Sequence, residues 1–303
     1  MMIQLLNGVV YGGLLYLLAV GLVLIFGLRE VVNFAHGSLF MVGAYIGFSL
    51  AAAGFWWVGL LVSVVAMAIG GCIIDAAIFR SLRKQDHMVT VLVTFGILLI
   101  LETVVTVIWG KAYLRYPVPP FLDGTVTIDG SPFPIYRLFV IAVSVTVALS
   151  LTAWLRFTRI GLHVRAASAD SRITAIQGIN VDRVSLIVVG LGTALAGLSG
   201  VVAGPLLTLS PTMGNYILID SFMVVVIGGL GSFAGAFVAA MLIGQIHNLG
   251  AIYLPWAATM LPFLLMVAIL IWRPTGFAGS RTSQRPRCTR RPREPDRLRV
   301  LAL

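Results

Sequence analysis

A succession of long apolar runs restricts the fold of this chain more than any other feature. A helix needs roughly 20 apolar residues to cross the hydrocarbon core of a bilayer. Because 59% of the 303 residues are hydrophobic and only 11% are charged, far from the soluble norm, we predict an all-α, polytopic transmembrane helix bundle. The predicted crossings are residues 3–28, 37–54, 56–79, 89–109, 135–155, 184–204 and 255–272.

A further apolar stretch, residues 217–249, is too long for one crossing and contains the sequence GGLGS at 228–232. Gly228, Gly229 and Gly231 permit backbone angles that other residues resist. We therefore predict a helix break here, with a short helix on each side; a re-entrant pair is the alternative. The whole chain then has about eight to nine membrane-crossing segments.

The basic residues predict the orientation, since cytoplasmic loops carry an excess of Lys and Arg. The strongest basic segments are 80–87, 156–183 and the Arg-rich C-terminal region. Placing them inside puts the N-terminus outside and the C-terminus in the cytoplasm, with nine basic residues of the membrane domain inside and three outside. The net charge of +10 thus reflects membrane topology, and we expect no nucleic-acid partner.

No sequence feature predicts catalysis or a bound cofactor. The four histidines are dispersed without paired ligand spacing, and the two lysines, Lys84 and Lys111, complete no phosphate-binding loop. Cys72 and Cys288 make no disulfide framework. The N-terminal run lacks the features of a cleaved signal and is read as a retained helix. Residues 110–134 are predicted to be an external loop, for which a small hairpin is one option and which is either a docking surface or a solvated connection.

The run 31–48 is apolar except for a polar cluster near its start: Asn33, His36, Gly37 and Ser38. A polar group without a partner costs several kcal/mol in hydrocarbon, so the cluster must face protein or water. One interpretation is a break that lines a translocation route at an inner gate, together with Thr94 and Gly96. The other is a capped helix start near the cytoplasmic side, with Ser38 or His36 as the cap.

The cytoplasmic segment 156–183 contains a predicted short helix. Ser168 or Asp170 is suited to the N-cap, and Gly178 is suited to the left-handed C-terminal stop. Such a helix with a small apolar face is suited to a partner's groove; a helix lying on the membrane surface is the alternative. The predicted helix lies within residues 168–178, and its candidate contact residues are Ala169, Asp170, Ser171, Arg172, Ile173, Ala175, Ile176 and Gly178.

Three motifs in order, VVNFAHGSLFMVGAY, HVRAASADSRITAIQGINVDRV and VVVIGGLGSFAGAF, resemble the permease subunits of bacterial branched-chain amino-acid ABC importers. The likeness extends over about residues 3–279. It implies a second homologous permease subunit, two cytoplasmic ATPase subunits that bind the ATP, and a periplasmic or tethered binding protein, in a bacterial inner membrane. By resemblance, the 168–179 region is the coupling helix that contacts the ATPases.

The Arg- and Pro-rich region 280–303 departs from the resemblance. Its composition cannot bury a core, so we expect a disordered tail after a permease domain of residues 1–279. A solvated basic tail, a contact with anionic lipid and an altered reading frame are the three interpretations.

An ion-coupled secondary carrier is the alternative function, because carriers place charged groups near the membrane midplane. Asp75 and Glu102 are its candidates; Asp75 is close enough to Arg80 to pair with it or to reach the interface. Glycines four residues apart favour close helix packing; they are Gly8 and Gly12, Gly43 and Gly47, Gly200 and Gly204, and Gly231 and Gly235.

Overall fold

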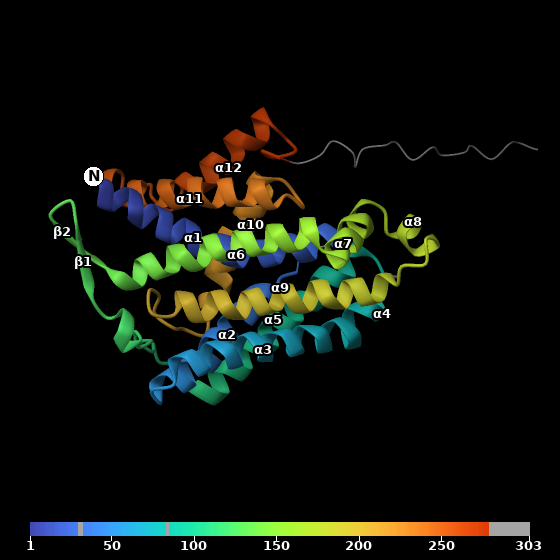
Figure 1. Cartoon of the computed structure of the whole chain (residues 1–303), viewed down its shortest axis with the longest axis horizontal. Coiled ribbons are helices and arrows are strands. Elements are labelled where there is room, and N and C mark those ends of the chain that lie inside the picture. Colours follow the sequence, from blue (N-terminus) through green and yellow to red (C-terminus); the bar gives the residue numbers. More distant parts are fainter. Residues whose placement is uncertain (30–32, 83–84, 279–303) are drawn as a thin grey trace, which may run out of the picture.

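The computed structural model describes residues 1–29, 33–82 and 85–278. The basic tail expected from residue 280 lies outside this part of the chain. The described chain is an all-α bundle (Figure 1). Its longer helices are α1 (Met2–Arg29), α2 (Ala35–Ala52), α3 (Trp56–Ile74), α5 (His87–Trp109), α6 (Ile135–Phe157), α7 (Arg159–Ala169), α9 (Val181–Ala203), α10 (Met213–Gly228), α11 (Phe233–Tyr253) and α12 (Leu261–Trp272).

Six of the seven predicted membrane spans are confirmed as long apolar helices: α1, α2, α3, α5, α6 and α9. In the seventh, residues 255–272, only the 12-residue helix α12 forms, and the seventh helix of the described chain that is long and apolar enough to cross a membrane is α11, for which a short helix was predicted; α10 is a shorter apolar helix. The span that contains α3 continues through a π-helical turn, η1 (Asp75–Phe79), and ends in α4 (Arg80–Leu82). The protein is therefore a multi-pass membrane protein.

The core is built around α1, which packs against α6, α9, α10 and α11. Residues 12–25 of this helix are all buried. Glycines make these contacts possible: a Cβ on Gly12 would lie 2.7 Å from the Ala240 carbonyl oxygen of α11, and a Cβ on Gly43 would lie 2.6 Å from the Gly197 Cα of α9. At these positions the paired glycines serve packing within the chain.

The predicted helix break at GGLGS is confirmed. Helix α10 ends at Gly228 and α11 begins at Phe233. Gly229 and Gly231 have φ angles of +92° and +83°, in the region that favours glycine. Ser232 then caps α11, because its hydroxyl accepts from the Gly235 amide at 3.1 Å.

The loop between α5 and α6 contains the expected hairpin. Strand β1 (Thr125–Ile128) pairs antiparallel with β2 (Ser131–Pro134) after a short 3₁₀ turn, η2 (Pro120–Leu122). Figure 1 shows this hairpin and the N-terminus at one end of the bundle, and α7 with α8 (Ser171–Ile176) at the opposite end. The predicted external and cytoplasmic loops are thus separated by the length of the bundle.

Candidate functional site

Residues 169–178, which contain α8 and are called the α8 segment below, have the predicted local structure. The Asp170 carboxylate accepts from the amides of Arg172 and Ile173 at 2.9 and 3.0 Å, so Asp170, rather than Ser168, is the N-cap. Gly178 follows the helix with a φ angle of +85°. A Cβ at Gly178 would meet no atom within 4 Å, so the backbone angle alone favours glycine there.

One face of α8 is anchored and the other is open. Thr174 is buried, and its hydroxyl donates to the Asp170 carbonyl oxygen at 2.8 Å. Ile173 is 56% exposed and Ile176 is 85% exposed, although both are large apolar residues. Their exposure at one end of the bundle leaves an apolar surface available to a partner.

Helix α2 begins deeper in the bundle than the sequence suggested. The His36 ring lies 3.2 Å, through Nε2, from the Leu18 carbonyl oxygen of α1. Leu18 precedes Arg29 by eleven residues, which is roughly 16 Å along a helix. We expected α2 to start near the level of Arg29; it instead starts beside the middle of α1, where His36 contacts the Leu18 carbonyl oxygen.

The start of α2 is also not capped as expected. Neither His36 nor Ser38 caps the helix: the N-cap residue is Phe34, which makes no side-chain cap hydrogen bond, and the carboxamide oxygen of Asn33, the residue before it, accepts from the Ala35 amide at 3.1 Å. The Phe34 amide donates to the hydroxyl of Thr94 on α5 at 3.4 Å. The structure thus brings the start of α2 into contact with Thr94. Gly96 lies two residues beyond Thr94 and contacts nothing at its Cβ position.

Gly37 is a contact point between two helices. A Cβ on Gly37 would fall on the Gly214 carbonyl oxygen, and a Cβ on Gly214 would fall on the Gly37 carbonyl oxygen. Gly214 is the second residue of α10. The first turns of α2 and α10 therefore touch through their backbones, and only glycine permits this distance.

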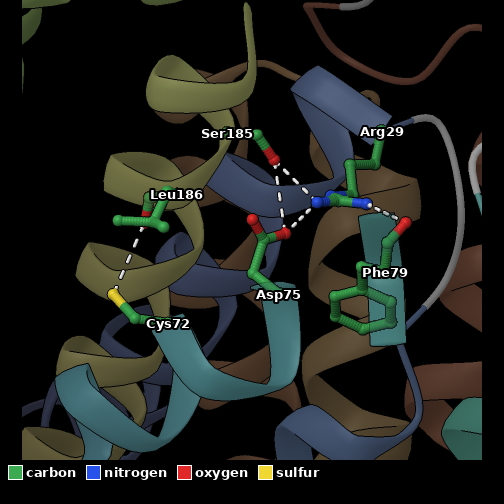
Figure 2. Close-up of polar contacts among 6 residues, drawn as sticks. All are labelled: Arg29, Cys72, Asp75, Phe79, Ser185 and Leu186. Carbon is green, nitrogen blue, oxygen red and sulfur yellow. Dashed lines mark hydrogen bonds and ion pairs between the residues drawn. The ribbon is translucent and has the colours of Figure 1, made fainter. Parts of the chain in front are cut away.

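A buried ion pair ties three helices at the α8 end of the bundle (Figure 2). Arg29, at the end of α1, pairs with Asp75, the first residue of the π-helical turn. Arg29 also donates to the Ser185 hydroxyl of α9 at 2.7 Å and to the Phe79 carbonyl oxygen at 3.3 Å. Its guanidinium lies 4.9 Å from the centre of the Phe79 ring. π-Helical turns often mark functional sites.

The partner of Asp75 corrects a prediction. Asp75 neither reaches the interface nor pairs with Arg80: its side chain is fully buried against Arg29, and Arg80 is exposed. The sequence offered no signal for this pairing, since the two residues are 46 positions apart. Glu102 is partly exposed, and within the described chain its carboxylate has no hydrogen-bond partner.

A second polar cluster, which the sequence did not predict, joins α1, α10 and α11. The Tyr11 hydroxyl donates to the Asp220 carboxylate at 2.7 Å. The Tyr11 ring also stacks on His247 with 4.5 Å between the ring centres. The three residues lie on three different helices, so only the packing of these helices reveals the group.

Comparison with known proteins identifies the family. A family model described as "Branched-chain amino acid transport system / permease component" matches residues 4–270. The high-affinity branched-chain amino acid transport system permease protein LivH of Escherichia coli (strain K12) is 27% identical over 293 residues, covering 91% of this chain and 94% of the relative. BraD of Pseudomonas aeruginosa, a permease protein of the same printed description, is 27% identical over 291 residues, covering 91% of this chain and 95% of the relative.

A more distant relative is the ribose import permease protein RbsC of Escherichia coli (strain K12), which is 25% identical over 247 residues and covers 77% of this chain and 73% of the relative. No solved structure matches the chain significantly. Since the family model covers nearly all of the helical bundle, the chain belongs to the family of branched-chain amino acid transport system permease components.

Proposed function

We propose that this chain is the transmembrane permease subunit of an ABC importer and forms half of the translocation pathway for branched-chain amino acids. The family match over residues 4–270 is the observation that carries this proposal. The other subunits of the importer are a second homologous permease, two cytoplasmic ATPase subunits and a periplasmic or tethered binding protein. The importer lies in a bacterial inner membrane. ATP is bound by the ATPase subunits, and this chain is a transporter subunit rather than an enzyme.

The α8 segment is the proposed contact with the ATPases. Three observations support this role: Asp170 caps the helix, Gly178 ends it, and Ile173 and Ile176 expose an apolar face. Helix α9 begins at Val181, directly after the segment. A displacement of α8 would therefore act on α9, which packs against α1, α2 and α3.

Reconstitution tests the proposed function. Liposomes that hold this chain with its partner permease and ATPases should take up leucine only when ATP and the binding protein are supplied. The chain alone should transport nothing. Uptake of radiolabelled leucine is the measurement.

An ion-coupled carrier is the competing function, and its evidence now rests on Glu102, because Asp75 is paired with Arg29. A carrier would transport leucine in liposomes without partners when an ion gradient is imposed. Such uptake by this chain alone would overturn the ABC proposal.

The proposed orientation has the N-terminus outside and the C-terminus in the cytoplasm. The basic segments at 80–87 and 156–183 support it, as does the separation of the β1–β2 hairpin from α8 (Figure 1). A reporter that is active only in the periplasm should be active when inserted at Asp129, in the hairpin turn, and inactive when fused after residue 278. The reverse pattern would contradict this orientation.

A further inference from the structure

Helix α5 is held within the chain along one side. Among the described residues, α2 is the helix against which it packs extensively. The Phe34 amide donates to the Thr94 hydroxyl at one end of this contact, and Trp109 Nε1 donates to the Ser49 hydroxyl at 2.9 Å at the other end. The two helices therefore run parallel, and most of the surface of α5 is left open.

The period of the helix divides α5 into three lengthwise stripes. Each residue turns a helix by about 100°, so positions three and four apart lie on the same side. The stripe toward α2 contains the buried residues Thr94, Leu98 and Val105. One open stripe, called the mixed stripe, consists of Leu92, Phe95, Leu99, Glu102 and Thr106. The other, called the aliphatic stripe, consists of Val93, Ile97, Ile100, Val104 and Val107.

The two open stripes differ in their chemistry. The aliphatic stripe contains only valine and isoleucine, which are favourable in hydrocarbon. The mixed stripe contains a hydroxyl and a carboxylate. The Thr106 hydroxyl donates to the Glu102 carbonyl oxygen at 2.8 Å, so it needs no partner outside the helix. The Glu102 carboxylate has no hydrogen-bond or ionic partner among the described residues.

Glu102 lies too deep in the span for this carboxylate to be ignored. It is within the apolar span Met88–Trp109 and seven residues before Trp109, which is roughly 10 Å along the helix. Ionisable side chains inside a span are costly in lipid, and they almost always face other protein or a water-filled cavity. The carboxylate therefore needs a partner that the described part of this chain does not supply.

The proposed importer has one other component with helices at this depth. The ATPases are cytoplasmic and the binding protein lies outside, so the second permease is the subunit that reaches Glu102. A second copy of this chain fits less well. An interface between identical surfaces repeats every residue, so it would contain two Glu102 carboxylates and supply no opposite charge.

We propose that the second permease subunit packs on the mixed stripe of α5, and that one of its transmembrane side chains, with a hydrogen-bond donor or a positive charge, pairs with Glu102. The aliphatic stripe faces lipid. The proposal rests on the proposed function and adds to it the surface that joins the two permeases. It also gives Glu102 a role that needs no coupling ion.

Two adjacent residues allow a matched test. Leu99 on the mixed stripe is 48% exposed, and Ile100 on the aliphatic stripe is 63% exposed, at nearly the same depth. A photo-cross-linking residue, benzoylphenylalanine, replaces one or the other in the complete importer in membranes, and the second permease carries an epitope tag. Illumination should link the tagged permease several-fold more strongly from Leu99 than from Ile100, although Ile100 is the more exposed.

The outcomes separate this inference from the proposed function. Equal cross-linking from the two sites, stronger cross-linking from Ile100, or none from either would overturn the proposed surface. A product that contains two copies of this chain would also overturn it, because the stripe would then bind a second copy. Leucine uptake is measured separately on the parent importer, and absence of ATP-driven uptake would refute the proposed function.

A second variant covers the case in which the bulky cross-linking residue prevents assembly. Glu102→Leu removes the carboxylate and leaves the donor of the second permease buried without a partner. The fraction of tagged permease that co-purifies with this chain should fall several-fold. Glu102→Gln still accepts a hydrogen bond and should retain more. If the stripe faced lipid, leucine would be the more favourable residue, and unchanged co-purification with Glu102→Leu would overturn the proposal.

Discussion

Replacement of Ile176 by glutamate is expected to abolish ATP-driven uptake while the permease still inserts and keeps its partner permease. Ile176 is 85% exposed, so the change removes no packing within this chain. A charge on the apolar face of α8 would have to be desolvated in the ATPase groove, which costs several kcal/mol. Co-purification of the ATPases and leucine uptake should both be lost.

Two further substitutions separate a coupling helix from a helix that lies on the membrane surface. Ala169→Trp adds bulk beside α8; tryptophan favours membrane interfaces, so it should be harmless to a surface helix but should obstruct a partner. Gly178→Val forces a β-branched residue to adopt a φ of +85°, at a cost of about 1–2 kcal/mol. We expect both variants to lose uptake.

The matched control for Ile176→Glu is Leu230→Glu. Leu230 is an exposed apolar residue, 53% accessible, in the turn between α10 and α11. This change introduces the same charge outside the α8 segment and should leave uptake largely intact. Normal uptake and ATPase retention by both Ile176→Glu and Ala169→Trp would contradict the coupling role.

Replacement of Asp75 by alanine is expected to destabilise the permease strongly. The side chain of Asp75 is fully buried, and that of Arg29 is 14% exposed. Removing one partner of a buried pair leaves an uncompensated charge and costs about 3–5 kcal/mol. The midpoint of thermal unfolding in detergent should fall, together with the yield of folded protein.

A double-mutant cycle tests the physical cause. Arg29→Met with Asp75→Ala removes both charges, so the double variant should be more stable than Asp75→Ala alone. Ser185→Ala is the milder control, because it removes only a hydroxyl from the cluster, at a cost of about 1 kcal/mol. If the double variant were less stable than Asp75→Ala, the ion pair would not be the main source of the effect.

The predicted helices were recovered because their signals are local. An apolar run of about 20 residues can satisfy its backbone in a membrane only as a helix, and the structure has helices at each predicted run. The helix break at GGLGS could be predicted from the sequence for a similar reason, since Gly229 and Gly231 adopt positive φ angles that few other residues tolerate. The Asp170 cap acts on amides two and three residues away.

Tertiary packing decided the depth of the polar residues of α2 and the partners of Arg29. The sequence marked Asn33, His36 and Ser38 as polar but misplaced their depth, because depth depends on the contact of His36 with Leu18 of another helix. Arg29 meets Asp75 and Ser185 across 46 and 156 positions, and an apolar helix pattern does not determine which faces of separate helices come together.

The sequence by itself determined the membrane spans, the glycine break and the capped α8 helix, since each depends on residues within one or two turns of each other. The meeting of the α2 and α10 N-termini followed only from the packed bundle. Helix association in a membrane is driven by close packing and hydrogen bonds rather than by the hydrophobic effect. Which glycines approach, as Gly37 and Gly214 do, therefore depends on the shapes of all the neighbouring helices at once.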